Sequence, residues 1–293
     1  MDLCNINDIK ALLARHGFRF SKSMGQNFLI QPWVPREIAK ASGAGPGTGV
    51  LEIGPGIGPL TRELSLLADR VAAVELDRSL LPILAETLAD RNNVEIVPGD
   101  VMKLDLPALV AEKLPGLRPM VCANLPYNIT TPVITTFLEA GCFSAITVMI
   151  QREVAQRICA QPGTADYGAF SVLCQYYAKT ELLFDVGPEC FIPAPKVTSS
   201  VLRLTPRPAP AEVDDPQHFF RVVRTAFAQR RKTLVNSLSS ALGSPLSKEE
   251  LAGAIAACGL PESVRGERLS LSDFAALSRE LRRIEGNFSA PME

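Results

Sequence analysis

Short apolar runs alternate with longer segments of helical spacing between residues 49 and 151. The apolar runs are rich in β-branched residues and predict buried strands at 49–53, 71–75, 94–97, 120–123 and 145–150. The intervening segments predict helices at 59–68, 79–91, 105–113 and 131–140. Strands that alternate with helices in this way form βαβ units, so the pattern predicts an α/β fold with a parallel sheet.

A different pattern follows this region. Segments 153–160 and 170–178 have helical spacing, whereas 180–186 and 197–204 have the pattern of a late pair of strands. These elements fit a doubly wound sheet that ends in a hairpin.

A proline-rich stretch then separates two parts of the chain. Pro206, Pro208 and Pro210 stand at alternate positions, which favours an extended connector without helix. Beyond it, the spacing of apolar residues predicts helices at 218–242, 247–258 and 272–284. We therefore expect an α/β domain over residues 1–205 and a small helical domain over residues 206–293.

The composition excludes several classes of protein. With 47% hydrophobic and 21% charged residues, the 293-residue chain has an ordinary globular composition. Two histidines argue against a multi-histidine metal site and against a Ser-His-Asp hydrolase, so we expect no bound metal. No run approaches the roughly 18 apolar residues of a membrane span, and we expect no membrane association.

The cysteines indicate a reducing environment. The chain has seven, an odd number without a C-x-x-C pair, and most stand in apolar runs where a thiol packs as a small hydrophobic group. The first residues contain no basic stretch followed by an apolar one, so we expect no export signal. A cytoplasmic location is the expectation that follows.

A glycine-rich turn joins the first predicted strand to its helix. Its spacing is G-x-G-x-G from Gly54, and Pro59 takes the place of the last glycine in the G-x-G-x-x-G turn that binds pyrophosphates. This difference argues against NAD or FAD and favours a nucleoside ligand without phosphates. Glu75 ends the second strand and Asp100 follows the third, where a carboxylate can accept hydrogen bonds from ribose hydroxyls. Either carboxylate alone could be an exposed strand end, but together with the turn they favour a nucleoside site.

The segment Asn124-Leu125-Pro126-Tyr127 follows the fourth predicted strand, at the same edge of the sheet. The exocyclic amine of adenine is a weak nucleophile because its lone pair is delocalised into the ring. The Asn124 side-chain oxygen and a backbone carbonyl could accept its two N–H groups and stabilise the charge that develops during attack. The Tyr127 ring offers a flat surface on which a flipped-out base can stack. Asn and Pro also favour turns, so these residues alone do not exclude a structural turn.

Taken in order along the chain, these motifs resemble those of the ribosomal RNA adenine N6-dimethyltransferases. The resemblance is found in segments 25–29, 52–61, 75–77, 99–100, 124–132 and 191–197. The C-terminal segments 227–238 and 265–270 resemble the members that act on the small subunit more closely than the macrolide-resistance members that act on large-subunit RNA.

The resemblance implies a fold and a reaction. The fold is a Rossmann-like class I S-adenosylmethionine-dependent methyltransferase domain followed by a small all-α C-terminal domain. The reaction is transfer of methyl groups from S-adenosylmethionine to N6 of two adjacent adenosines in the 3′-terminal hairpin loop of 16S rRNA. Each base would be methylated twice, late in small-subunit assembly.

The resemblance also assigns roles to single residues. S-adenosylmethionine would contact Asn27, Leu29, Gly54, Glu75, Asp100 and Asn124. Within this set Glu75 would hold the ribose hydroxyls, Asp100 the adenine amine and the Gly54 turn the methionine portion. The catalytic set around the target base would be Asn124, Leu125, Pro126, Tyr127 and Phe191, with the Leu125 carbonyl as the second acceptor and the two rings around the base. Taken alone, Phe191 could also be a loop side chain that fills the core, but together with the segment from Asn124 to Tyr127 it is better interpreted as a clamp on the base.

Positive charge for RNA binding must be local, because the chain has 30 Lys and Arg against 31 Asp and Glu. Residues 216–248 contain basic and no acidic side chains, namely Arg221, Arg224, Arg230, Arg231, Lys232 and Lys248. The first five are the predicted RNA-binding residues, with Lys10, Arg15, Arg19 and Lys22 as further candidates. Phosphate contacts of this kind make binding sensitive to salt, although a charge run can also be a solvated helix face.

Other functions stay open at this point. A methyltransferase of the same fold that acts on large-subunit RNA would share every catalytic motif, and only the C-terminal sequence argues against it. An assembly factor that merely binds RNA would need the basic segment but not Asn124. An NAD-dependent dehydrogenase is disfavoured by the glycine spacing. We expect a monomer whose partner is 16S rRNA within the small subunit or its precursor.

Overall fold

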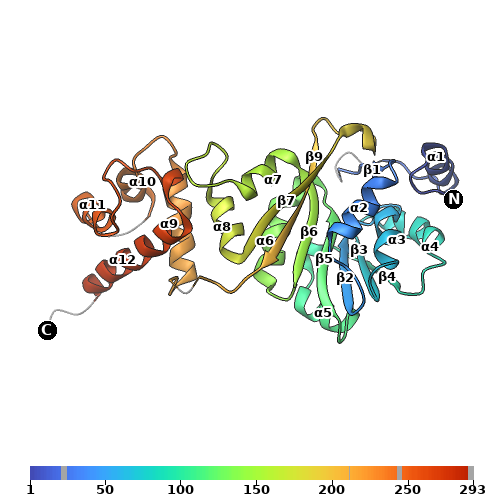
Figure 1. Ribbon diagram of the computed structural model, residues 1–293, viewed down its shortest axis with the longest axis horizontal. Coiled ribbons are helices and arrows are strands. Elements are labelled where there is room, and N and C mark those ends of the chain that lie inside the picture. The colour runs from blue at the N-terminus through green and yellow to red at the C-terminus, as the bar shows by residue number, and fades with distance from the viewer. Residues whose placement is uncertain (21–24, 211, 243–245, 290–293) are drawn as a thin grey trace. The chain divides into compact units, whose positions relative to one another are not determined.

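The computed structural model describes residues 1–20, 25–210, 212–242 and 246–289. Its contacts divide the chain into two compact units (Figure 1). The first unit comprises Met1–Ala155 and Ala178–Pro206, and the second comprises Gln156–Tyr177 and Arg207–Glu293. The last change of unit lies beside the boundary expected after residue 205, but residues 156–177, which we expected in the first domain, group with the helical unit.

The first unit is built on a seven-stranded sheet with the strand order β4-β3-β2-β5-β6-β9-β7 (Figure 1). The strands are β2 (Thr48–Ile53), β3 (Arg70–Glu75), β4 (Val94–Pro98), β5 (Arg118–Asn124), β6 (Ala145–Gln151), β7 (Ala178–Val186) and β9 (Ser199–Pro206). Strands β2 to β6 are parallel, and β9 runs antiparallel to both β6 and β7. The five parallel strands and the late strand pair that the sequence predicts are thereby confirmed.

Six helices of the described chain belong wholly to the first unit: α1 (Ile6–Arg15), α2 (Trp33–Ala41), α3 (Pro59–Ser65), α4 (Leu81–Thr87), α5 (Leu106–Lys113) and α6 (Thr130–Ala140). A seventh, α7 (Arg152–Cys159), begins in the first unit and ends in the second. The sequence analysis did not predict α1 or α2. A signal for α1 exists, because the Asn5 side chain caps its first turn and Ile9, Leu12 and Leu13 form its buried stripe.

Helices α2 and α3 pack against each other and against one face of the sheet. Val34 and Ile38 of α2 and Leu60 and Leu64 of α3 are buried together with side chains from β2, β3, β5, β6 and β9. Burial of such apolar side chains on one face of the sheet is the main stabilising contribution to this layer. The polar side chains at the carboxyl ends of these strands, such as Glu75 and Asn124, lie outside this apolar layer.

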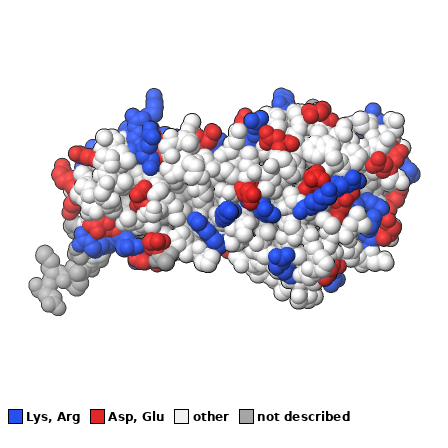
Figure 2. All heavy atoms as spheres, viewed as in Figure 1, with Lys and Arg blue, Asp and Glu red and all other residues white. Residues whose placement is uncertain are grey.

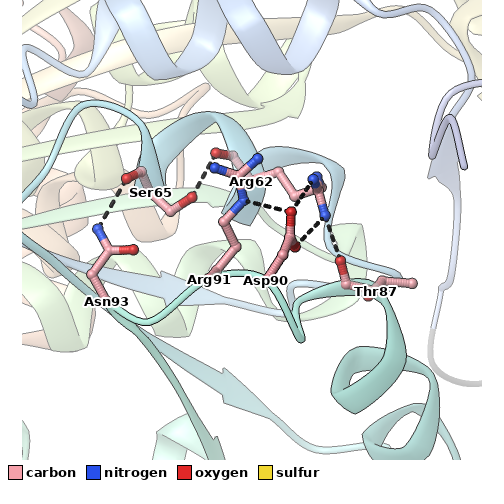
Figure 3. Close-up of polar contacts among 6 residues, drawn as sticks. All are labelled: Arg62, Ser65, Thr87, Asp90, Arg91 and Asn93. Atoms are coloured by element: carbon pink, nitrogen blue, oxygen red, sulfur yellow. Dashed lines mark hydrogen bonds and ion pairs between the residues drawn. The ribbon is translucent and has the colours of Figure 1, made fainter.

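A polar network fixes helix α3, which follows the glycine turn (Figure 3). Arg62 donates two hydrogen bonds to the carboxylate of Asp90, at 2.9 and 2.8 Å, and one to the carbonyl oxygen of Thr87, at 2.7 Å. Asn93 donates from its amide to the carbonyl oxygens of Ser65 and Ala68. These contacts join the middle and the C-terminal end of α3 to the chain from the end of α4 to the start of β4, so the glycine turn leads into a fixed helix.

A short antiparallel ladder joins two distant segments of the first unit. Strand β1 (Phe28–Leu29) pairs with β8 (Phe191–Ile192), with Leu29 opposite Phe191. The ladder brings the N-terminal segment beside the proline-rich loop that precedes β9. Two motifs at opposite ends of the first unit's sequence therefore meet in space.

The second unit is helical, as predicted, and contains α8 (Ala169–Tyr177), α9 (Pro216–Ala228), α10 (Leu234–Ala241), α11 (Lys248–Ala257) and α12 (Leu271–Ser289). Its core includes the buried rings of Tyr167, Phe219 and Phe274, and the Tyr167 hydroxyl donates to the carbonyl of Leu269 at 3.0 Å. These contacts explain why residues 156–177 belong to this unit.

One predicted helix of this unit is wrong. The spacing of residues 218–242 predicts a single helix, but the structure has α9 and α10 with a turn between them. The Leu234 N–H donates to the carbonyl of Val264 at 2.7 Å, a tertiary bond that replaces a helical one. Periodicity alone could not reveal this break, because both helices bury their apolar faces in the same core.

Three further findings concern the described residues. None of their helices is long and apolar enough to cross a membrane. They include no cluster of His, Cys, Asp and Glu side chains suited to a metal ion. All seven cysteines are described and have free thiols.

Candidate active site

A cavity opens at the carboxyl ends of β2, β3, β4 and β5 in the first unit. It is lined by every residue that the sequence analysis placed at the cofactor or the target base: Asn27, Leu29, Gly54, Glu75, Asp100, Asn124, Leu125, Pro126, Tyr127 and Phe191. The edge of a parallel sheet brings together residues that are far apart in the sequence.

The glycine turn that follows β2 packs against the N-terminal segment at Phe28. The Gly54 N–H donates to the carbonyl of Val74 at 2.9 Å, which ties the turn to the neighbouring strand β3. Gly56 has a φ of +62°, and a Cβ there would lie 3.2 Å from the ring of Phe28. The turn therefore requires glycine both for its backbone conformation and for the close packing of the segment above it.

Glu75 is held at the end of β3 with only 6% of its surface exposed. Its Oε1 accepts a hydrogen bond of 2.7 Å from the Asp77 N–H, and Gln26 donates to Asp77 Oδ2 at 2.7 Å. Burial raises the pKa of Glu75, while hydrogen bonds from backbone N–H groups of Asp77 and Gly56 oppose the rise. Sequence reasoning assigned no role to Gln26 or Asp77, and their contact across two motifs becomes visible only in the fold.

Asp100 follows β4 and lies on the same rim of the cavity. Its Oδ1 accepts a hydrogen bond of 3.0 Å from the Met102 N–H and so caps the short helix η3 (Val101–Lys103). Its Oδ2 lies 3.8 Å from Lys103 Nζ, whose side chain is 81% exposed. The cap fixes the direction of the Asp100 carboxylate, and the weak, solvated ion pair leaves it available to a ligand.

The segment from Asn124 to Tyr127 turns sharply at the end of β5. The Leu125 N–H donates to the carbonyl of Met149 at 3.1 Å, and its side chain is 1% exposed. The Pro126 carbonyl accepts from the Ile129 N–H and from the Thr130 hydroxyl. Backbone bonds on both sides of Leu125 thus fix the segment while Asn124 and Tyr127 line the cavity.

Phe191 has two roles at once in the structure. Only 3% of its surface is exposed, and it belongs to the apolar cluster that includes Leu29 and Val34. It also lines the cavity together with Tyr127. The alternatives of core packing and cavity wall, which the sequence presents as distinct, are therefore compatible.

Glu52 is a further cavity residue to which sequence reasoning assigned no separate role. It is 1% exposed, and its Oε2 has no hydrogen-bond partner among the described residues. Burial raises its pKa to about 8, to which the nearby Glu75 carboxylate contributes, while the Thr61 hydroxyl opposes the rise. Glu52 is therefore a neutral acid at pH 7.

Replacing Glu52 by glutamine should alter the pH dependence of stability. The folded chain keeps the Glu52 proton up to about pH 8, whereas the unfolded chain loses it near 4.5, so folding binds a proton in this window. The free energy of unfolding of the parent chain then falls as the pH rises from 4.5 to about 8. Glutamine does not titrate, so its stability relative to the parent should grow by a few kcal/mol across the window, as measured by urea unfolding.

The matched control is Glu181→Gln, which removes an exposed carboxylate that pairs with Arg203 at 3.2 Å. Its stability relative to the parent should change by less than about 1 kcal/mol over the same window. Parallel curves for Glu52→Gln and the parent would contradict the assignment of a buried neutral acid.

The five predicted RNA-binding residues lie in the second unit, and three of them lie outside its helices. Arg230, Arg231 and Lys232 occupy the turn between α9 and α10, not a helix as predicted. Arg230 donates to the carbonyl oxygens of Ala165 and Tyr167, so it holds this turn in place. Arg231 and Lys232 are exposed.

The other two predicted RNA-binding residues are on α9. Arg221 lies 3.5 Å from Glu285 of α12, so part of its charge is balanced, while Arg224 is exposed. Figure 2 shows a compact group of basic side chains projecting from the helical unit, with acidic side chains interspersed elsewhere on this face. Near the N-terminus Arg15 pairs with Glu86, and Lys22 lies outside the described residues.

Comparisons with known proteins agree with this geometry. Residues 17–261 match the family described as Ribosomal RNA adenine dimethylase. The chain belongs to this family. It is therefore an S-adenosylmethionine-dependent methyltransferase, and the fold and cofactor implied by the sequence motifs are confirmed.

Relatives in the family match nearly the whole chain. "Ribosomal RNA small subunit methyltransferase A" of Geobacillus thermodenitrificans is 46% identical over 284 residues, which cover 96% of this chain and 97% of the relative. The protein of the same name from Alkaliphilus metalliredigens is 46% identical over 274 residues, covering 93% of this chain and 95% of the relative.

Solved structures of the family share the fold. A dimethyladenosine transferase from Plasmodium falciparum has a TM-score of 0.74 at 24% identity, covering 88% of this chain and 98% of that one. The 23S rRNA methyltransferase ErmE has a TM-score of 0.66 at 26% identity, covering 87% of this chain and 99% of that one.

Proposed function

We propose that the chain dimethylates N6 of two adjacent adenosines in the 3′-terminal hairpin loop of 16S rRNA during small-subunit biogenesis. The observation that carries the proposal is the meeting of Asn124 and Tyr127 with Glu75 and Asp100 in one cavity. The 46% identity to relatives named for the small subunit supports this target over large-subunit RNA, since the 23S enzyme is 26% identical.

The charge of the cavity lining suits S-adenosylmethionine. Two carboxylates, those of Glu75 and Asp100, line it together with the neutral carboxyl group of Glu52, and none of the described lining residues is Lys, Arg or His. Such a site favours a cation, and the cofactor has a sulfonium and an ammonium group. The Gly54 turn allows the ligand to approach the backbone, Glu75 would bind the ribose hydroxyls, and Asp100 would bind the adenine amine.

The residues around Asn124 would orient the target amine. When bound, S-adenosylmethionine supplies an electrophilic methyl group. The Asn124 side-chain oxygen and the Leu125 carbonyl would accept the two N–H groups of adenine N6, directing its lone pair at the methyl carbon. Because the segment is fixed by the Leu125 and Pro126 backbone bonds, little reorganisation is needed during transfer.

Aromatic and apolar side chains would hold the base. Tyr127, which is half-buried, and Phe191, which is buried, both line the cavity. A base flipped out of the RNA would stack on these rings, and the buried Leu125 and Leu29 would keep water from the reacting atoms.

The helical unit would supply phosphate contacts through the exposed Arg224, Arg231 and Lys232. Replacing both Arg231 and Lys232 by alanine should weaken binding to small subunits and reduce the slope of log K against log salt by about 1.5. Affinity measured at several salt concentrations checks this. The control is Arg283→Ala, an exposed arginine paired with Glu280 at 2.7 Å, for which the slope should not change. An unchanged slope in the double variant would remove the turn from the RNA-binding surface.

The proposed target is tested by supplying labelled S-adenosylmethionine with small or large ribosomal subunits that lack the modification. Label in the small-subunit RNA alone supports the proposal. Label in the large-subunit RNA alone keeps the methyltransferase assignment and overturns the substrate. No label in either, with the cofactor bound, would favour a factor that acts by binding.

A further inference from the structure

A hydrogen bond within the first unit connects the catalytic segment to a distant strand. The hydroxyl oxygens of Tyr127 and Ser199 lie 2.7 Å apart. Tyr127 belongs to the short helix η4 (Tyr127–Ile129), which directly follows Pro126, and Ser199 is the first residue of β9. Nothing in the motifs around either residue predicts this contact, because the two are 72 positions apart.

The location of Ser199 follows from the sheet topology. Strand β9 runs antiparallel to β6, with Ser199 opposite Gln151, the last residue of β6. The start of β9 therefore lies at the same edge as the carboxyl ends of the parallel strands, where the cavity opens. Ser199 is 0% exposed, so its hydroxyl is fixed by the surrounding sheet and not by solvent.

The bond also connects the two segments that bear aromatic cavity residues. Phe191 lies on β8, and residues 193–198 lead directly from β8 to Ser199. Strand β8 is fixed in turn by its ladder with β1. A tyrosine hydroxyl bound to Ser199 is thus tethered to the same stretch of chain that positions Phe191.

The hydrogen bond to Ser199 restrains where the Tyr127 ring lies in the cavity lining. The hydroxyl oxygen of a half-buried tyrosine lies on the axis of its Cβ–Cγ bond, so a hydrogen bond there restrains rotation about the Cα–Cβ bond, which would carry the whole ring away from the cavity. Burial raises the pKa of Tyr127, and the Ser199 hydrogen bond opposes the rise, so the phenol stays neutral in ordinary assay buffers. Either hydroxyl can then act as the donor.

We propose that Ser199 is a positioning residue that fixes the position of the Tyr127 ring on which the target adenine stacks. The inference rests on the proposed function, because it assumes a base at Tyr127. It assigns Ser199 no contact with substrate or cofactor. Its effect on the reaction passes through Tyr127 alone.

The test is a double-mutant cycle of Ser199→Ala and Tyr127→Phe, assayed on unmodified small subunits. Each single variant removes one hydroxyl and keeps the ring. Each should lower kcat about three- to tenfold, the size expected for one hydrogen bond, with little change in KM for the subunit and in the dissociation constant of S-adenosylmethionine. The double variant should be no slower than the slower single variant, because both changes break the same bond.

Ser200 offers a matched control on the same strand. It is also 0% exposed, and its hydroxyl donates to Asp185 at 2.5 Å, so Ser200→Ala likewise removes a buried serine hydrogen bond. Its side chain points to the other face of the sheet from that of Ser199. Ser200→Ala should lose stability comparable to Ser199→Ala but keep the parent kcat, with all assays run well below the unfolding temperature of each variant.

The outcomes separate clearly. The positioning role would be overturned if the fold-loss of kcat in the double variant equalled the product of the two single losses. Equal kcat values for Ser199→Ala, Ser200→Ala and the parent would also overturn it. If Ser199→Ala fails to fold, a parent-like kcat for Tyr127→Phe would overturn the role by itself. Failure of the proposed function would instead be seen in the parent chain, which would then transfer no methyl group to small subunits.

Discussion

Replacing Asn124 by alanine is expected to reduce methyl transfer by roughly 100- to 1000-fold, the loss found when one preorganised acceptor or donor is removed from a developing charge. Asn124 is the last residue of β5, and its neighbour Leu125 is fixed by a backbone bond to Met149, so alanine should leave the segment in place. Single-turnover rates with excess enzyme over unmodified small subunits measure this loss. Part of the affinity for S-adenosylmethionine should be kept.

The control for this variant is Asn128→Ala, which removes a second amide from the same cavity lining. Its rate should stay within about tenfold of the parent, because in the proposed reaction only Asn124 and the Leu125 carbonyl bind the reacting amine. Turnover in Asn124→Ala equal to that of the parent would remove Asn124 from the chemistry and would favour the assembly-factor alternative.

Replacing Glu75 by alanine should mainly weaken binding of S-adenosylmethionine, by about 10- to 100-fold, since hydrogen bonds to a charged group contribute about 1.5 to 3 kcal/mol. The Asp77 N–H, which donates to the Glu75 carboxylate at 2.7 Å, already holds this side chain in place. Ligand binding therefore costs little side-chain entropy at Glu75. Calorimetric titration gives the affinity. At saturating cofactor the rate of transfer should recover most of the parent value.

Two variants accompany this measurement. Glu75→Gln keeps the shape of the side chain and should lose less affinity than alanine. Glu181→Ala removes an exposed carboxylate on β7, paired with Arg203, and should leave the affinity unchanged. If Glu75→Ala binds the cofactor as tightly as the parent, Glu75 does not belong to the binding site.

The parallel part of the fold was readable from the sequence because each of its elements is defined by local patterns. Buried β-branched runs such as 71–75 and the glycine turn after β2 need no knowledge of distant residues. The ends of the helices in the second unit, by contrast, could not be predicted from local patterns. The end of α9 depends on tertiary bonds from Leu234 to Val264 and from Arg230 to Tyr167, and residues 156–177 join this unit through contacts such as Tyr167 with Leu269.

The candidate site shows the same contrast. Glu75, Asp100 and Asn124 could be predicted because each lies at or just after the carboxyl end of a strand, and the carboxyl ends of parallel strands share one edge. The contacts of Gln26 with Asp77 and of Tyr127 with Ser199 depend on how separate segments pack, which no spacing in the sequence encodes. The neutral state of Glu52 likewise follows from complete burial between β3 and β5, a property of the assembled sheet.

The central claim is that this cavity forms N6,N6-dimethyladenosine in small-subunit RNA. It is tested most directly by treating unmodified small subunits with the protein and S-adenosylmethionine, cutting out the 3′-terminal fragment of the 16S rRNA, and identifying its nucleosides by mass and chromatography. We expect N6,N6-dimethyladenosine at two adjacent positions with the parent chain and none with Asn124→Ala. Methyl groups on ribose or on ring nitrogens, or an equal yield from Asn124→Ala, would contradict it.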